Sequence, residues 1–393
     1  MDGLDGAPTS RHLTHRAKST SNRSHPVPAS GAVLDDVRTR VAGWAASTLD
    51  PMDDAGGGER GRRPDLTPAL AATIEATWGF GVESARPLGG STGLNLLVKS
   101  ALGPVVVRAH RSHVTSDRVE AMQLAREGAA SAGVPTASLM SGRNGEHHVS
   151  VGSTVVEVER FVASDGKMDT IERITQGMPM LACLHDALGS LELPDAANDA
   201  RFANYIPAGQ VVTMTGRGTR RMRHRDVSLH RMADVADRLA RELSEAERGL
   251  KPLEGQWCHG DYWDDNVLFR GGELVLVGDF GFMNRRPRVD DLALTLYFML
   301  WELDSAGVNN PADVLATLVD AYDRAAQQQL SDPEREALPL ALARQPLWSV
   351  GVWAVQLDDP EEVRAHLHGH ENALRLAERV LVDLDRWRDA FRG

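Results

Sequence analysis

Residues 259–279 constrain the fold of this chain more than any other segment, because they place polar side chains around a predicted β-hairpin. They read HGDYWDDNVLF, then RGGE as a turn, then LVLV, and they end in GDFG. A hairpin brings the ends of its strands together, so Asp279, after the second strand, should return beside Asn266, before the first. Asp261 stands at the start of the same loop. The sequence therefore predicts two carboxylates and one amide at one end of the hairpin.

These three side chains are the groups that phosphoryl transfer requires from a protein. The reaction needs a carboxylate that orients and deprotonates the acceptor, and it needs oxygen ligands for magnesium. Asp261 is placed to face a substrate hydroxyl, while the Asn266 amide and the Asp279 carboxylate can share one side of a metal site. A magnesium ion there neutralises charge on the transferred phosphate. The spacing thus predicts a phosphotransferase.

The segment also resembles the catalytic loop and metal loop of the aminoglycoside phosphotransferase and choline-kinase-like family, which shares the protein-kinase fold. Its specific part is the His-Gly-Asp-x-x-x-x-Asn pattern followed by an aspartate at a strand end. The resemblance implies that Asp261 is the catalytic base, that Asn266 and Asp279 bind Mg²⁺, and that ATP is the co-substrate. It also implies that His259 packs and hydrogen-bonds within the loop and does not react.

Four further aspartates lie close to this motif. Asp290 and Asp291 open the segment DDLA, which resembles the Asp-Leu-Ala element of the family. We expect Asp291 to be structural and to cap backbone N–H groups of the catalytic loop from a helix start. Asp290 is interpreted as solvated surface charge. Asp264 and Asp265 lie inside the loop, where either could contact a cationic substrate, although exposed loop carboxylates are common.

The nucleotide end of the site is predicted from residues 89–93, which read GGSTG between two predicted strands. Glycines let backbone amides approach phosphates closely, and a serine or threonine hydroxyl adds a donor. Alone, a glycine-rich hairpin is usually only a turn. Its place one strand before a basic residue matches the phosphate-covering loop of the family, so we expect Gly90, Ser91 and Thr92 to contact the nucleotide. It is not a P-loop, because no Lys-Ser or Lys-Thr follows.

Arg108 lies on the next predicted strand, at the place where protein kinases carry a phosphate-binding lysine. Arginine also binds phosphate, so this departure costs little. Its partner acid is expected on the helix predicted at 117–132. There Glu120 fits the spacing to the helix-ending GVP at 133–135 better than Glu127 does. The alternative for both glutamates is a solvated helix face.

Adenine is expected to dock where the strand predicted at 154–162 enters the helical half of the chain. Backbone atoms near Glu159, Arg160 and Phe161 would contact it, so their side-chain identity carries little information. Leu184-His185 resembles a Leu-His motif of the family, and we expect His185 to be a structural histidine.

The order of predicted elements indicates two lobes. Strands are predicted at 85–88, 94–98, 105–109, 147–151 and 154–162, and helices at 66–78, 117–132, 171–188, 228–248, 290–304, 311–328 and 360–388. Strands with one helix are followed mostly by helices, which favours an α+β fold. We therefore expect a bilobal protein-kinase-like fold with a small antiparallel β lobe and a larger, mostly helical lobe.

Three regions follow from this order. Residues 1–63 are predicted to be a disordered or linker extension, in which 33–49 could form one amphipathic helix. Residues 64–162 would form the small nucleotide-binding lobe. Residues 163–393 would form the large catalytic and acceptor-binding lobe.

Composition restricts the partners and the compartment. A formal net charge of −12 argues against a nucleic-acid partner. The two cysteines, Cys183 and Cys258, are too few for a disulfide framework, which favours the reducing cytoplasm. The longest apolar run, at 292–301, is far shorter than the roughly 20 residues that a bilayer requires. We infer no membrane contact and no obligatory protein partner.

Three functions remain to be distinguished. The first is a small-molecule kinase whose acceptor hydroxyl belongs to an aminoglycoside or other antibiotic, an amino alcohol or a sugar, with ATP or GTP as donor. The second is a pseudokinase that binds nucleotide and serves as an interaction module, but such a chain should have lost one of the three motif residues. The third is a protein kinase, which the absence of an Ala-Pro-Glu element disfavours.

Overall fold

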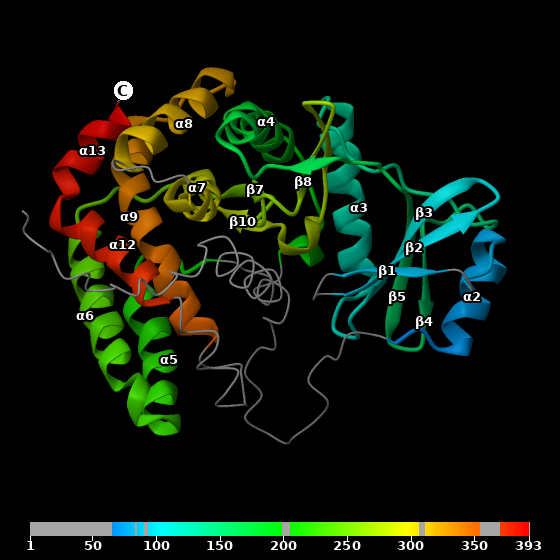
Figure 1. Ribbon diagram of the computed structural model, residues 1–393, viewed down its shortest axis with the longest axis horizontal. Helices are drawn as coiled ribbons and strands as arrows, with labels where there is room; N and C mark the ends of the chain where they lie inside the picture. Colours follow the sequence, from blue (N-terminus) through cyan, green and yellow to red (C-terminus); the bar gives the residue numbers. More distant parts are fainter. Residues whose placement is uncertain are drawn as a thin grey trace, which may run out of the picture.

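The computed structural model of the chain describes residues 65–82, 85–89, 93–198, 205–305, 311–353 and 370–392. These residues form two lobes that lie side by side, with the small lobe on the right of Figure 1 and the large, mostly helical lobe on the left. The fold class expected from the sequence is therefore confirmed. The extension predicted at 1–63, including the helix predicted at 33–49, lies outside the described residues.

An antiparallel sheet with the strand order β1-β2-β3-β5-β4 forms the centre of the small lobe. Its strands are β1 (Arg86–Gly89), β2 (Gly93–Ser100), β3 (Gly103–His110), β4 (His148–Val151) and β5 (Thr154–Arg160). Two helices pack on it, namely α2 (Pro68–Trp78) and α3 (Ser116–Ser131). Because β5 lies between β3 and β4, both of its edges are paired. Residues of α2 pack on one face of this strand, and side chains of α3 bind the two glutamates on the other face.

Alternation along β5 decides what each face of the sheet receives. Val156 and Val158 are fully buried in an apolar core that also contains residues of α2. Glu157 and Glu159 alternate with these valines and are almost as deeply buried. Side chains two apart on a strand share a face, so the two carboxylates point away from α2 and towards α3. This face of the sheet belongs to the candidate site.

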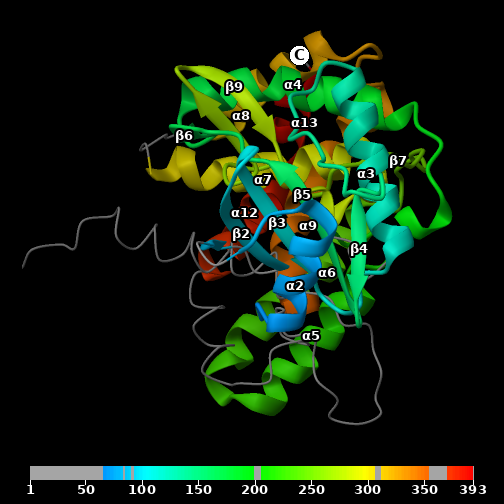
Figure 2. The ribbon, with the colours of Figure 1, turned by 90° about the vertical axis from the view of Figure 1, so that its right-hand side faces the viewer.

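The large lobe contains helices packed around a fully buried interior. They are α4 (Ile171–Gly189), α5 (Val211–Arg225), α6 (His230–Ala246), α7 (Arg288–Ser305), α8 (Pro311–Ala325), α9 (Asp332–Trp348), α12 (His370–Val382) and α13 (Leu384–Arg392), with the short helices η1 (Asp195–Ala197), η3 (Val227–Leu229) and η4 (Phe280–Phe282) and the π-helix η5 (Ser349–Trp353). Figure 2 shows α5 extending below the rest of the lobe. No helix in the described ranges is both long and apolar enough to cross a membrane.

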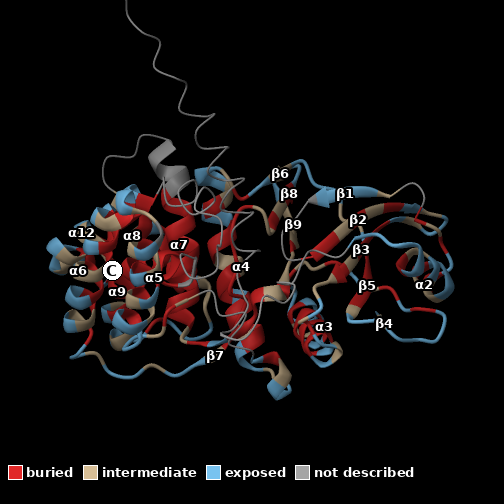
Figure 3. Ribbon diagram, turned by 90° about the horizontal axis from the view of Figure 1, so that it is seen from below, coloured by how far each residue is buried: buried red, intermediate tan, exposed pale blue. Residues whose placement is uncertain are grey.

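Helix α9 forms much of this interior, and the sequence did not predict it. Every residue from Ala337 to Trp348 is buried. Figure 3 shows buried residues gathered in the interior of the large lobe, with exposed residues on its outer helices. A helix that is buried all round has no polar stripe, so the usual period of 3.6 residues is missing. Pro339 and Pro346 further weaken the helical signal. Tertiary packing, and not an amphipathic pattern, accounts for this helix.

Two small sheets lie beside the small lobe and carry the catalytic segment. One pairs β7 (Gln256–Cys258) with β10 (Asn284–Arg286), and the other contains β6 (Gly166–Lys167), β8 (Val267–Arg270) and β9 (Glu273–Val277). The pairing of Val267 with Val277 confirms the hairpin predicted from the sequence. The segment between Arg160 and Ile171, which contains β6, connects the strands of the small lobe to α4. The domain boundary after residue 162 stays a prediction.

The prediction of a single helix at 360–388 is wrong. Two helices, α12 and α13, are separated at Asp383, and residues 354–369 lie outside the described residues. The other predicted helices agree with the structure to within a few residues at each end. Helix α5, like α9, was not predicted.

The contact between α5 and η5 gives a test of this packing. A Cβ atom added at Gly218 would overlap the carbonyl oxygen of Val350, whereas at Gly216 it would meet only the end of the Arg220 side chain, at 3.5 Å. We expect Gly218→Ala to lower the free energy of unfolding by about 3 kcal/mol through overpacking. Gly216→Ala, on the same helix, should raise it by about 0.5–1 kcal/mol through helix propensity. Urea unfolding of both variants checks this, and equal shifts would contradict the close contact.

Candidate active site at the lobe boundary

The catalytic loop begins directly after β7, with His259, Gly260 and Asp261. Gly260 has φ 77°, and a Cβ atom there would overlap the carbonyl oxygen of Phe282. Only glycine adopts this conformation without strain, and it lets the loop pass close to the segment after Asp279. The turn directs Asp261 into the protein, where only 3% of the residue is exposed.

Asn266 and Asp261 are in direct contact. The amide nitrogen of Asn266 donates a hydrogen bond to Oδ2 of Asp261 at 2.7 Å and another to the backbone carbonyl of Asp261 at 2.8 Å. These two bonds fix the orientation of the Asp261 carboxylate. They also use the amide nitrogen, so the amide oxygen of Asn266 is the atom that remains for a cation.

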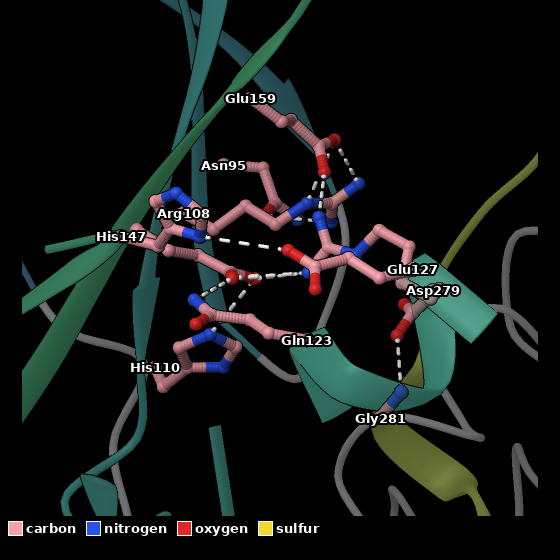
Figure 4. Close-up of polar contacts among 11 residues, drawn as sticks. Asn95, Arg108, His110, Gln123, Glu127, His147, Glu159, Asp279 and Gly281 are labelled. Carbon is pink, nitrogen blue, oxygen red and sulfur yellow. Dashed lines mark hydrogen bonds and ion pairs between the residues drawn. The ribbon is translucent and has the colours of Figure 1, made fainter. Parts of the chain in front are cut away.

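Asp279 follows β9 and adopts an unusual backbone conformation. Among the described residues it is the only non-glycine with positive φ, at 56°. Such a conformation costs a non-glycine residue about 1–2 kcal/mol, and strained residues cluster at functional sites. Asp279 Oδ1 accepts a hydrogen bond from Gly281 N at 3.1 Å, as Figure 4 shows. Gly278 N donates to Asn266 O at 2.8 Å, which places Asp279 beside Asn266.

The pKa of Asp261 is raised well above its ordinary value of 3.8. Burial is the largest cause, because it penalises the charged carboxylate, and the negative charge of Asp279 is the second. The hydrogen bond from Asn266 acts in the opposite direction. A buried carboxylate with a raised pKa is a stronger base, which suits proton transfer from a hydroxyl. The structure thus brings Asp261, Asn266 and Asp279 together, as the sequence predicted.

His259 connects the catalytic loop to the strand that precedes Asp279. Its Nε2 donates to Gly278 O at 3.0 Å, and its Nδ1 accepts from Asp261 N at 3.3 Å. This arrangement requires the neutral ring, and burial lowers the pKa of His259 below 6.5. Both ring nitrogens are used by backbone groups, which is the geometry that the predicted supporting role requires.

Asp291 holds the loop from the other side. Its Oδ1 accepts a hydrogen bond from Gly260 N at 2.9 Å, and its Oδ2 lies 3.0 Å from His185 Nε2. His185 Nδ1 lies 2.8 Å from the hydroxyl of Tyr322. Burial would raise the pKa of Asp291, but the hydrogen bond and charge of His185, together with Arg286, lower it to about 2. This is the contact expected of a residue that caps the catalytic loop.

A group of three metal-ligating side chains, His185, Cys258 and Asp291, lies behind the loop, with their ligand atoms within 4.8 Å of one another. Both ring nitrogens of His185 and both oxygens of Asp291 already have hydrogen-bond partners. Cys258 Sγ donates to Arg286 O at 3.7 Å. The group is therefore satisfied without a metal and serves as structural support.

Asp290 is buried, and it is not the solvated surface charge expected from the sequence. Only 3% of the residue is exposed, and its carboxylate forms an ion pair with Arg344 of α9. Arg344 also binds Glu247 at 2.8 Å. The interpretation was wrong because α9, which supplies the partner, was not predicted.

A cavity opens beside Asp279, between the small lobe and the loop that follows β9. It is lined by Gly93, Asn95, Arg108, Ala109, His110, Val114, Met122, Arg126, Ala137, Glu157, Glu159, Val277, Gly278, Asp279, Phe280 and Gly281. Both Arg108, the predicted phosphate ligand, and Asp279, a predicted metal ligand, contribute to its wall. Gly90, Ser91 and Thr92 lie outside the described residues.

The predicted pairing of Arg108 with a glutamate of α3 is wrong. Nη2 and Nε of Arg108 donate to Oε1 of Glu159, on β5, at 2.8 and 3.0 Å, as Figure 4 shows. The Glu120 and Glu127 side chains are 60% and 55% exposed, and each carboxylate lies 3.7 Å from a ring nitrogen, that of His148 and His147 respectively. Both therefore lie on the solvated face of the helix, which was the alternative. Arg108 Nη1 donates to Asn95 Oδ1 at 3.3 Å.

Glu159 binds Arg108 through its side chain, whereas the sequence predicts only backbone contacts at this position. Arg160 N donates to Ser138 O at 2.9 Å, and Phe161 N donates to Pro104 O at 3.2 Å. These two N–H groups are used within the small lobe, and adenine contact at Phe161 stays a prediction. The alternation of Glu157 and Glu159 with valines on a buried strand was the signal that could have found the acid.

Comparisons with known proteins identify the family of this chain. A family model described as the phosphotransferase enzyme family matches residues 84–339, which is more than half of the chain. The chain belongs to this family. Its matched region includes β3, α3, β5, the catalytic loop and Asp279.

Two curated relatives of this family member are homoserine kinases. The one from Phenylobacterium zucineum is 33% identical over 119 residues, which cover 28% of this chain and 35% of that protein. The one from Rhodopseudomonas palustris is 37% identical over 112 residues, which cover 28% of this chain and 32% of that protein. The match thus spans about a third of the length of these curated relatives.

Solved structures share the fold over most of the chain. An amicoumacin kinase, solved in complex with AMP-PNP, Ca²⁺ and Ami, has a TM-score of 0.60 at 11% identity, and the match covers 80% of this chain and 94% of that one. A microcompartment-associated aminopropanol kinase has a TM-score of 0.58 at 16% identity, and the match covers 80% of this chain and 97% of that one. An aminoglycoside phosphotransferase from Alicyclobacillus acidocaldarius has a TM-score of 0.58 at 18% identity, and the match covers 84% of this chain and 99% of that one. They establish the protein-kinase-like fold.

The depressed pKa of Asp291 predicts a pH-dependent contribution to stability. The folded pKa of about 2 lies below the ordinary 3.8, so the contribution is present above about pH 4 and is lost as the pH falls towards 2. We expect Asp291→Asn to lower the free energy of unfolding by about 2 kcal/mol at pH 7. The difference from the wild type should shrink below pH 4 in urea titrations.

The control for this variant is Asp385→Asn, because the Asp385 side chain is 97% exposed. It should change the unfolding free energy little at any pH. A difference between Asp291→Asn and the wild type that is independent of pH would contradict the ionised cap.

Proposed function

We propose that this chain is an ATP- and Mg²⁺-dependent kinase that transfers the γ-phosphate of ATP to a hydroxyl of a small molecule. The observation that carries the proposal is the convergence of Asp261, Asn266 and Asp279 beside the cavity that contains Arg108. A base, two oxygen ligands for a cation and a phosphate-binding cation are the parts that this reaction needs.

Asp261 would act as the base. Its carboxylate is held by the amide of Asn266, so it is oriented to accept the proton of an acceptor hydroxyl. Burial and the neighbouring Asp279 raise the pKa of Asp261 and so increase its affinity for that proton. The restrained side chain also positions the hydroxyl, which supplies much of the rate in phosphoryl transfer.

The amide oxygen of Asn266 and the carboxylate of Asp279 would hold Mg²⁺. They are hard oxygen donors of the kind that Mg²⁺ prefers, and the amide nitrogen is already committed to Asp261. The mutual repulsion of Asp261 and Asp279 is a further reason to expect a cation here. When bound, the ion neutralises charge on the transferred phosphate. Arg108 would bind a phosphate oxygen from the opposite wall of the cavity.

The acceptor class is supported by the names of relatives. They are described as kinases of homoserine, aminopropanol and amicoumacin and as an aminoglycoside phosphotransferase. We therefore propose an aminoglycoside or other antibiotic, an amino alcohol or a sugar as acceptor for this chain. In the catalytic loop, Asp265 forms an ion pair with Lys167, so its charge is compensated within the protein.

We also propose a cytoplasmic location. Cys183 and Cys258 are both free thiols, as expected in a reducing compartment. Burial raises the pKa of Cys258 well above 9, which keeps this thiol protonated and unreactive.

A coupled assay of ADP or GDP release tests the proposal. The wild type is supplied with ATP or GTP and with amino sugars, antibiotics and amino alcohols in turn. We expect turnover with at least one acceptor, and a loss of kcat of about a thousandfold in Asp261→Asn, because the base is removed. Affinity for MgAMP-PNP, measured by calorimetry, should stay within about threefold, because Asp261 does not bind the nucleotide.

Asp385→Asn is the matched control and should keep full turnover, because this side chain is exposed on α13. Unreduced turnover of Asp261→Asn would refute the base assignment. Tight nucleotide binding by the wild type without release on any acceptor would instead favour the pseudokinase.

A further inference from the structure

Helix α3 presents a cation to the candidate site, where the predicted partner of Arg108 was an acid. Arg126 of α3 is 7% exposed and lines the same cavity as Arg108 and Asp279. Its Nη1 donates to Glu159 Oε2 at 2.7 Å, and its Nη2 donates to both oxygens of Glu157 at 3.0 Å. The acids of this network thus come from the sheet, and the helix supplies a positive charge.

The periodicities of the three elements bring these groups together. Glu157 and Glu159 share one face of β5, and Arg108 and His110 share one face of β3, because each pair is two residues apart. Arg108 lies directly opposite Glu157 in the register of the two strands. On α3, Gln123 and Arg126 are three residues apart and lie on the face that is buried against the sheet.

Glu159 is shared between two arginines, one oxygen each. Oε1 accepts from Arg108 at 2.8 and 3.0 Å, and Oε2 accepts from Arg126 at 2.7 Å. Figure 4 shows Arg108 directed at Glu159 across the cavity from Asp279. Because the carboxylate is planar, fixing one oxygen through Arg126 also fixes the other, and with it the guanidinium of Arg108.

The shared carboxylate matters when a phosphate enters the cavity. A phosphate competes with Glu159 for Arg108, and a buried carboxylate that loses its only cation is strongly destabilised. Here Arg126 remains on Glu159, so Arg108 can turn to the phosphate without leaving an unpaired charge. Burial would raise the pKa of Glu157, but attraction to Arg126, with His110 and Gln123, lowers it, so the second acid of the network also stays charged.

Helix α3 is also attached to the metal loop at its other end. Arg118, which is 2% exposed, donates to the carbonyl oxygens of Gly281 at 3.1 Å and Met283 at 2.6 Å. These residues directly follow Asp279. One helix therefore contacts both the acids that hold Arg108 and the loop that carries Asp279.

We propose that Arg126 is a positioning residue for the triphosphate of the nucleotide: it holds Glu159, orients Arg108 through it, and compensates Glu159 when Arg108 engages phosphate. Arg118, on the same helix, keeps this cation network in register with the loop after Asp279. The proposal rests on the proposed kinase function. Protein kinases link strand β3 to a helix by a Lys–Glu ion pair. In this chain an Arg–Glu–Arg bridge, in which β5 supplies the acid, takes the place of that pair.

A double-mutant cycle with MgAMP-PNP as the probe tests the proposal. The variants are Arg126→Met, Arg108→Met and the double variant, and affinity is measured by calorimetry. We expect Arg126→Met alone to weaken binding about tenfold, because a charge-assisted hydrogen-bond network is lost. In the Arg108→Met background the same change should weaken binding by less than about twofold, because Arg126 acts through Arg108.

Leu124→Gln is the control, since Leu124 is 49% exposed on the same helix and should leave affinity unchanged. Arg126→Lys keeps the charge but cannot span both carboxylates, and we expect about a threefold loss. If Arg126→Met does not fold, the double-mutant cycle is repeated with Arg126→Lys in its place. In the active enzyme the KM for ATP should rise in Arg126→Met while the KM for the acceptor stays constant.

Two results would overturn the proposal. One is an unchanged MgAMP-PNP affinity in Arg126→Met, and the other is an equal loss with and without Arg108, which is what a merely structural role gives. Both require that the wild type binds MgAMP-PNP. If the wild type itself does not bind it, the proposed function fails first, and the two failures are thereby distinguished.

Discussion

The backbone hydrogen bond from Gly278 N to Asn266 O, at 2.8 Å, holds the candidate site together. It closes the open end of the β8–β9 hairpin. At this end the catalytic loop leads into β8, and β9 ends just before Asp279. The separation of the two proposed metal ligands is therefore set by sheet geometry and does not depend on flexible side chains. Asn266 then reaches back to Asp261, so the position of the proposed base follows from the same closure. A site built this way is preorganised, which is what a reaction that depends on positioning requires.

Burial of charge is the second constraint, because every ionised group at the lobe boundary needs a partner. Asp291 is satisfied by Gly260 N and His185, and it fixes the catalytic loop from the large-lobe side. Glu159 is satisfied by two arginines, and it fixes Arg108 from the small-lobe side. The carboxylates of these two residues have no proposed contact with substrate. One holds the loop that carries Asp261 and the other holds Arg108, so the fold and the chemistry of the site depend on the same interactions.

The parts of the site that depend on local spacing could be predicted from the sequence, and those that depend on tertiary contacts could not. The loop and hairpin follow from residues 259–279 alone. Glu120 was chosen by its distance along the chain from the end of the helix, but α3 turns it to solvent and buries Arg126 instead. A helical-face argument would have excluded Glu120, since the buried stripe of α3 includes Val119, Met122 and Arg126, at spacings of three and four residues. Helix α9 has no such stripe, because it is buried on every side from Ala337 to Trp348.

Anomalous diffraction from crystals grown with Mn²⁺ and AMP-PNP would locate the cation of the candidate site, because Mn²⁺ accepts the same oxygen ligands as Mg²⁺ and gives its own signal. We expect a manganese peak bonded to the amide oxygen of Asn266 and the carboxylate of Asp279, with the nucleotide phosphates on its other side and Asp261 close to the terminal phosphate. Phosphates bound elsewhere, or a manganese peak with neither side chain among its ligands, would contradict it.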